Sequence, residues 1–269
     1  MTHRVSAIGA LILFAVSAQA EGIQERAQRV IHEAIAALGG DSFLHLENRT
    51  ESGRVYAFYR EKLTGLATAT IYTKYVPISD AHDLAVRERD SFVKNDKSSK
   101  EEYADLFTDK GAWDIGYRGV RPLPGDRLPR FKESARRNVF YIMRERLHEP
   151  GMLLESRGSD VLDNRPVEIV DITDGDNDTT TVYFDQTTKL PMRQVFYRRD
   201  PETKDKDEEV TIFSKYRDVG GVQWPFDVQR MRNGEIIFQI YAESVKINQS
   251  LPDKLFELPS GVPMLKEQD

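Results

Sequence analysis

The 269-residue sequence contains no cysteine. A disulfide framework is therefore excluded, and so is a lipid anchor of the kind attached to a cysteine just after an export signal. With 39% hydrophobic and 30% charged residues, the composition is that of an ordinary globular chain. A hydrophobic core must therefore stabilise the fold without covalent cross-links.

An excess of positive charge is also missing. Beyond residue 20 the chain has 37 basic and 44 acidic residues, which gives a net charge of −7. We therefore expect no nucleic-acid binding, because that function needs clustered positive charge. No apolar run in this part of the chain approaches the roughly 20 residues of a transmembrane helix. We expect a soluble monomer that does not span a membrane.

The N-terminus predicts export. Its apolar run, Ile8–Val16, has 9 residues and follows a weakly basic start, and Ala18-Gln19-Ala20 is a small-x-small cleavage site. We expect a signal peptide over residues 1–20 that is cleaved after Ala20, a periplasmic location, and a single mature domain over residues 21–269. A retained N-terminal anchor is the alternative, although the run is short for a membrane span.

Motifs that carry catalysis or metal binding are absent as well. Acids alternate over Asp174–Asp178 as in an EF-hand loop, but Thr179 stands where that loop needs glycine and Asp185 where it needs glutamate. This segment and the acid-rich Asp200–Glu209 are better explained as hairpin turns. The histidines do not cluster, and neither a G-x-S-x-G elbow nor a phosphate-binding glycine loop occurs. We expect no catalytic residue, no cofactor and no metal.

Apolar periodicity predicts two helices. The first is Gln24–Leu38, which ends at Gly39-Gly40, and the second is Arg130–His148. Residues rich in Tyr, Thr and Val predict strands between them. These are Arg54–Glu61 and Leu66–Val76, joined by a turn at residues 63–65. We expect a solvated charged loop at residues 95–102 and a proline-rich loop at residues 121–129.

The C-terminal third predicts an antiparallel meander. Alternation over Val222–Arg230 indicates a strand with one wet face, and Pro225 favours an edge or a bulge. Asn233-Gly234 is a strong hairpin signal. The apolar positions then change parity, which predicts a bulge near Glu243-Ser244. We therefore predict an α+β protein that is mainly antiparallel β.

Short motifs in this third resemble those of the outer-membrane lipoprotein carrier (LolA-like) superfamily. They are YFD at 183–185 followed by LP at 190–191, YRDVGG at 216–221 leading into WPF at 224–226, and IN at 247–248 followed by LFELP at 255–259. The resemblance covers roughly residues 166–259. It implies an incomplete, strongly curved β-barrel, with helices over its concave face and an apolar cavity that receives acyl chains.

The resemblance also implies a periplasmic, non-enzymatic carrier of lipid or lipidated protein. Its partners would be lipid or lipoprotein acyl chains and envelope proteins of the inner and outer membranes. The candidates for lining the cavity are apolar side chains of the predicted strands and second helix, namely Tyr56, Phe58, Trp113, Phe140, Met143, Trp224 and Phe226. Each of the two tryptophans has an ordinary core position as its alternative explanation.

Two other functions remain open. One is a module that binds another envelope protein or senses lipid, and the other is a hydrolase with an unrecognised site. An open apolar cavity favours the carrier, and a filled concave face favours the interaction module. Buried acids or histidines that converge in a cleft favour the hydrolase.

Overall fold

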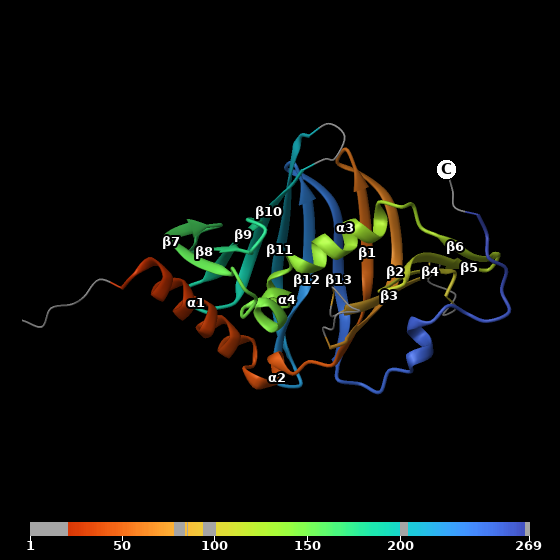
Figure 1. Cartoon of the computed structure of the whole chain (residues 1–269), viewed down its shortest axis with the longest axis horizontal. Coiled ribbons are helices and arrows are strands. Elements are labelled where there is room, and N and C mark those ends of the chain that lie inside the picture. The colour runs from red at the N-terminus through yellow and green to blue at the C-terminus, as the bar shows by residue number, and fades with distance from the viewer. Residues whose placement is uncertain (1–20, 78–83, 85, 94–100, 200–203, 267–269) are drawn as a thin grey trace, which may run out of the picture.

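The computed structural model describes residues 21–77, 84, 86–93, 101–199 and 204–266, and one large antiparallel sheet dominates it (Figure 1). Its strands lie in the order β6-β5-β4-β3-β2-β1-β13-β12-β11-β10-β9-β8-β7. Two meanders therefore meet where β1 pairs with β13. The bounds are β1 Asn48–Tyr59, β2 Lys62–Tyr75, β3 Val86–Val93, β4 Tyr103–Thr108, β5 Gly111–Gly116, β6 Gly119–Pro122, β7 Leu153–Leu162, β8 Arg165–Thr173, β9 Thr179–Asp185, β10 Pro191–Arg199, β11 Lys206–Val219, β12 Val222–Arg232 and β13 Glu235–Ile247.

The α-helices lie against one side of this curved sheet. Figure 1 shows one group beside β7 and β8 and another crossing in front of β12, β13 and β1. The predicted class, a mainly antiparallel half-barrel with helices over its concave face, is confirmed. The helical bounds are α1 Ile23–Leu38, α2 Asp41–Leu44, α3 Arg127–Arg136, α4 Val139–Tyr141, a π-helical turn Ile142–Arg146 and a 3-10 turn Asp253–Phe256.

Some expectations fall on residues outside the described ranges. These are the signal peptide, most of the charged loop at 95–102 and the first part of the turn at 200–209. Within the described ranges, no helix combines the length and the apolar character that crossing a membrane requires.

The first helix forms and ends as its sequence predicts. Five apolar side chains at helical spacing are buried on one face of α1, and Gly39 follows with a φ of 126°. A Cβ at Gly39 would overlap the carbonyl oxygen of Gly221, so this position requires glycine for both its dihedral angle and its close approach. The buried residues are Ala27, Val30, Ile31, Ala34 and Leu38.

The C-terminal hairpin and its bulge are also confirmed. Asn233 and Gly234 both have positive φ, 50° and 82°, as a two-residue hairpin turn requires. Farther along, Ser52 lies opposite Ser244 and Gly53 lies opposite Ala242, which leaves Glu243 as the extra residue of a bulge. The bulge lets both Ala242 and Val245 enter the core despite their odd separation.

Two expectations for β12 were wrong. Pro225 is not on an edge strand, since β12 lies between β11 and β13. Pairing of β12 with β13 begins only at Asp227, however, so the missing N–H of Pro225 interrupts no hydrogen-bond ladder on that side. The second face of β12 is not fully wet either. Asp227 is buried, and its carboxylate has partners there, since Gln239 Nε2 donates to it at 2.9 Å and Lys215 Nζ lies 3.2 Å away.

The predicted turn at residues 63–65 was also wrong. The chain reverses at Arg60 and Glu61, which both take positive φ, so that Tyr59 pairs with Lys62. This two-residue turn matches the twist of the flanking strands. Residues 63–65 consequently lie within β2.

The predicted helix Arg130–His148 is broken in the middle. Asn138 takes an extended conformation, and its side-chain oxygen accepts the backbone N–H groups of Phe140 and Tyr141. This local cap competes with helix continuation, and α3 therefore ends at Arg136. The predicted loop at 121–129 is likewise shorter, since β6 extends to Pro122 and α3 begins at Arg127.

Candidate ligand-binding cavity

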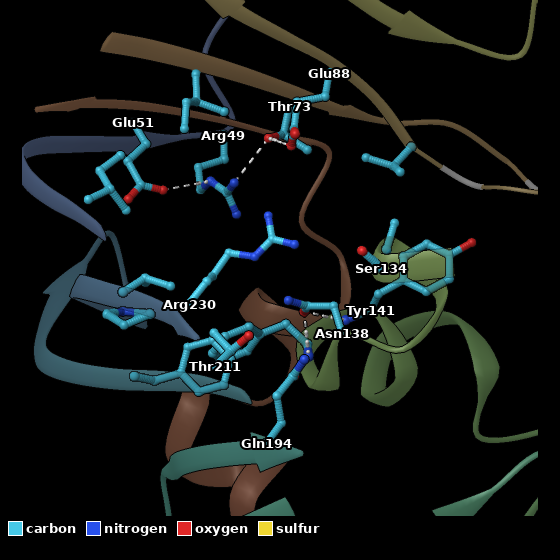
Figure 2. Close-up of a pocket in the computed structure, with 18 of the residues that line it drawn as sticks. Arg49, Glu51, Thr73, Glu88, Ser134, Asn138, Tyr141, Gln194, Thr211 and Arg230 are labelled. Atoms are coloured by element: carbon cyan, nitrogen blue, oxygen red, sulfur yellow. Dashed lines mark hydrogen bonds and ion pairs between the residues drawn. The ribbon is translucent and has the colours of Figure 1, made fainter. Parts of the chain in front are cut away.

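A cavity of about 250 Å³ lies between the concave face of the sheet and the α3–α4 segment. Figure 2 shows that strands surround it on one side and the short helices on the other. Strands β1, β2, β3, β10, β11, β12 and β13 contribute to its lining, so the cavity spans the junction of the two meanders. Its apolar lining includes Ile71, Val86, Phe131, Phe140, Phe196, Phe213, Trp224, Val228, Phe238 and Ile240.

Aromatic rings build one wall of the cavity. The ring of Phe140 on α4 lies 5.0 Å from Phe213 in an edge-to-face arrangement and 5.0 Å from Trp224 in a tilted one. On its other side Phe140 meets Phe43 at 6.3 Å. Because aromatic side chains bury large apolar areas, this cluster fixes α4 on the sheet and offers an apolar surface to a ligand.

Charged side chains adjoin this aromatic wall. Arg49 on β1 stacks its guanidinium 4.4 Å above the Trp224 ring, and its Nη2 donates to Thr73 Oγ1 at 3.0 Å. Its Nε lies 3.4 Å from the carboxylate of Glu51. Thr73 in turn donates to Glu88 Oε2 at 3.3 Å. Burial raises the pKa of both Glu51 and Glu88, and Arg49 opposes this rise in each case.

A row of aspartates continues this wall beneath α3. Asp90, Asp105 and Asp114 lie directly opposite one another on β3, β4 and β5. Burial, reinforced by Asp114 and opposed by Arg127, raises the pKa of Asp105 from 3.8 to about 6. Burial together with Glu88 and Asp105 raises the pKa of Asp90 well above its usual value. Like charges opposite one another destabilise a sheet, so this row costs stability.

We expect the substitution Asp105→Asn to stabilise the protein above pH 6. Because the folded-state pKa is raised, the folded chain retains the proton that the unfolded chain loses near pH 4. The wild type therefore loses stability as pH rises from about 4 to about 6, by about 2 kcal/mol once partial exposure is considered. Urea denaturation should show Asp105→Asn more stable by that amount at pH 8 and nearly equal to wild type at pH 4. A less stable variant at pH 8 would contradict this.

Two amides on the helical side anchor α4. Gln194 Oε1 accepts the backbone N–H of Val139 at 2.9 Å, and Asn138 Oδ1 accepts that of Phe140 at 3.0 Å. Because a backbone N–H can only donate, the accepting atoms must be the oxygens. The amide nitrogens of Asn138 and Gln194 therefore remain as donors at the cavity.

The structure distributes the sequence-predicted cavity residues over several sites. Phe140 and Trp224 line this cavity, and Met143 and Phe226 are buried in the adjoining core. Trp113 lines a separate hollow of about 330 Å³ beside the 3-10 turn. Tyr56 packs edge-on against Tyr241, and Tyr56 and Phe58 alternate with the inward-facing Arg49 and Glu51 along β1, which places them on the opposite face.

Sequence reasoning missed the polar lining. It began the first strand at Arg54, whereas β1 begins at Asn48 and directs Arg49 and Glu51 inward. The signal was present, because Arg49, Glu51 and Val55 have the same parity. The acidic segment Asp174–Asp178 does form the turn between β8 and β9. Among the described residues, no group of three or more His, Cys, Asp or Glu side chains is placed to hold a metal ion.

The chain matches no family model and no curated protein sequence. Solved structures do resemble it. A DUF1329 family protein from Desulfovibrio piger has a TM-score of 0.55 at 14% identity, over 86% of this chain and 97% of the other. A LolA superfamily protein from Nitrosomonas europaea has a TM-score of 0.53 at 12% identity, over 86% and 97%.

A third solved structure is a domain from Vibrio parahaemolyticus that is described as an outer membrane lipoprotein-sorting protein. It has a TM-score of 0.51 at 8% identity and covers 87% of this chain and 97% of its own. At such low identity the shared property is the fold, and the fold of this chain is LolA-like.

Proposed function

We propose that this protein is a periplasmic, non-enzymatic binder that carries a lipid or the acyl chain of a lipidated protein. The observation that carries the proposal is the cavity with an aromatic wall between the concave sheet and the α3–α4 segment. The LolA-like fold supports it, and so does a solved neighbour described as a lipoprotein-sorting domain. Each enclosed CH₂ group would contribute about 0.8 kcal/mol to binding.

A carrier must also release its load. The cavity of about 250 Å³ is small beside the roughly 300–1,000 Å³ of sites that enclose a drug-sized ligand. Part of an acyl chain would therefore stay outside unless α3 moves. None of the α3 side chains is buried, and its contacts with the sheet include the Phe131–Phe107 ring stack at 4.3 Å and the Glu133–Arg198 ion pair at 3.0 Å. Such a segment can shift at small cost, which suits both entry and release.

We assign the converging acids a structural role rather than a catalytic one. Glu51 and Glu88 are engaged by Arg49 and Thr73, and the described residues that line the cavity include no histidine beside them. A hydrolase would need a base or nucleophile in reach of a reacting atom. A filled concave face would favour an interaction module, whereas a cavity of about 250 Å³ leaves part of this face uncovered.

Filling the cavity tests the proposal. Ala135 lies on α3 and lines the cavity, and we expect Ala135→Trp to weaken the binding of a fluorescent fatty acid at least tenfold, about 1.4 kcal/mol. The matched control is Ala36→Trp, at an exposed position on α1, which should bind as wild type does. Fluorescence titration gives the affinities, and circular dichroism establishes that both variants fold. Unchanged binding by folded Ala135→Trp would place the ligand elsewhere.

A further inference from the structure

Arg230 on β12 directs its side chain into the cavity. It lies opposite Thr211 on β11 and Phe238 on β13, both of which also line the cavity. Figure 2 shows its guanidinium in the open centre, between Arg49 and the side that holds Asn138 and Gln194. Arg230 is therefore positioned to contact anything that enters.

Arg230 also differs from its neighbours in pairing. Arg232 donates to Glu209 at 2.9 Å, and Arg198 approaches the same carboxylate at 3.7 Å. Arg230 makes no hydrogen bond or ion pair with any residue in the described part of the chain. Glu209, Glu88 and Asp90 act on it only through longer-range attraction, and burial lowers its pKa.

An unpaired guanidinium in such a place is costly. Arg230 is partly buried, so its charge has lost part of its hydration without gaining a hydrogen-bonded partner in exchange. Local costs of this kind are typical of functional sites, where a ligand supplies the missing partner. The guanidinium offers five N–H donors in a planar fork that matches a carboxylate or a phosphate.

Further donors lie on the same side. The amide nitrogens of Asn138 and Gln194 remain free to donate because their oxygens accept backbone N–H groups. Glu51 and Glu88, which would repel an anion, already have partners of their own, Arg49 for Glu51 and Thr73 for Glu88. The aromatic wall of Phe140, Phe213 and Trp224 adjoins these donors, as the lining shows.

We propose that the cavity selects acidic amphiphiles, binding a carboxylate or phosphate head through Arg230 and the amides of Asn138 and Gln194 while the acyl chain lies on the aromatic wall. This rests on the proposed lipid-binding function and names its ligand class. Neutral amphiphiles of equal chain length would leave the guanidinium unpaired, and they would therefore bind more weakly.

The test compares three probes with one chain length: dodecanoic acid, dodecyl phosphate and dodecanol. With purified, delipidated wild type at pH 7.5, calorimetric titration should give acidic probes a Kd about 10- to 100-fold lower than that of dodecanol. Arg230→Gln should remove this preference and change the Kd of dodecanol by less than about threefold. The control Arg54→Gln removes an exposed charge that pairs with Glu243, and it should retain the preference.

The outcomes separate the two ideas. If the acid or the phosphate binds more tightly than dodecanol and Arg230→Gln removes the difference, the inference holds, and the tighter of the two probes identifies the head group. If the wild type binds all three equally, or Arg230→Gln keeps the preference, the inference is overturned while lipid binding stands. Failure of every probe to bind would instead overturn the proposed function.

A second measurement separates binding from a structural role. Arg230→Met keeps an extended side chain without the charge, and we expect its ligand-free melting temperature to equal or exceed that of wild type, because an unpaired charge is removed. Its preference for acidic probes should be lost. A clear fall in melting temperature would show that Arg230 supports the fold, and it would overturn the assignment.

Discussion

Replacing Gly53 by alanine is expected to destabilise the protein by at least about 3 kcal/mol, and to prevent folding if the reserve is small. A Cβ at this position would overlap the carbonyl oxygen of Tyr241 and lie 2.7 Å from Ala242 Cα. Both are backbone atoms of β13, so no change of side-chain rotamer relieves the overlap. Gly53 lies opposite Ala242, next to the unpaired bulge residue Glu243, and a glycine permits the close approach of the two strands there.

The effect should be large because β1 and β13 join the two meanders of the sheet. Strain at Gly53 therefore acts on the pairing that unites the molecule. Gly116→Ala is the matched control, since Gly116 lies in β5 and a Cβ there would contact nothing within 4 Å. Urea denaturation should place this control within about 1 kcal/mol of wild type. A Gly53→Ala protein of near-wild-type stability would show that the bulge can move aside.

Replacing Arg146 by methionine is expected to cost about 3–5 kcal/mol of unfolding free energy. Arg146 is 2% exposed, and it donates to the backbone oxygen of Arg136 at 2.8 Å, to Glu149 at 2.9 Å and to Asp174 at 3.0 Å. It thereby ties the end of α3 and the π-helical turn to the turn between β8 and β9. Without it, Asp174 keeps only its backbone donors in a partly buried site.

The cost should depend on pH. Burial would raise the pKa of Asp174, but Arg146 and the backbone N–H groups of Asp178 and Asp176 lower it below its usual 3.8. An acid whose pKa is lowered by folding stabilises the folded state at pH above about 4. This contribution is lost as the pH falls through the folded-state pKa. The difference in unfolding free energy between wild type and Arg146→Met should therefore be largest at pH 7 and should decrease below pH 4.

The control for this prediction is an exposed arginine. Arg29 on α1 pairs with Glu21 and Glu33 but leaves 41% of its side chain exposed. Arg29→Met should cost less than about 1 kcal/mol, as surface ion pairs usually do. Equal costs for Arg29→Met and Arg146→Met in urea denaturation would mean that the buried network contributes no more than a surface pair.

The parts of the fold that were predictable depend on local sequence. Asn233-Gly234 dictates a turn by its backbone preferences, and the change of parity after Ala242 reveals the bulge at Glu243. The period of α1 and the glycines that follow it are equally local. These features need no knowledge of which strands become neighbours.

The unpredicted parts depend on partners that are distant in sequence. Arg49 points inward, where it donates to Thr73 on β2 and stacks on Trp224 on β12. The residues next to Arg49 in the sequence do not indicate that these two side chains become its neighbours. Periodicity predicted one long second helix. The helix is instead interrupted at Asn138, whose side chain caps a new turn, and Gln194 from β10 stabilises that turn by accepting the N–H of Val139. The unpaired state of Arg230 likewise becomes visible only after β11 and β13 have enclosed it.

The strand order also determines the sequence of events in folding. Each meander pairs strands that are close in the chain, whereas the join at β1 and β13 closes a loop of about 200 residues, marked by the hydrogen bond from Glu47 N to Asn248 Oδ1 across 201 positions. Such closure carries a high entropic cost and slows folding. We therefore expect the two meanders to form early and their union, which creates the cavity, to be the late and rate-limiting step.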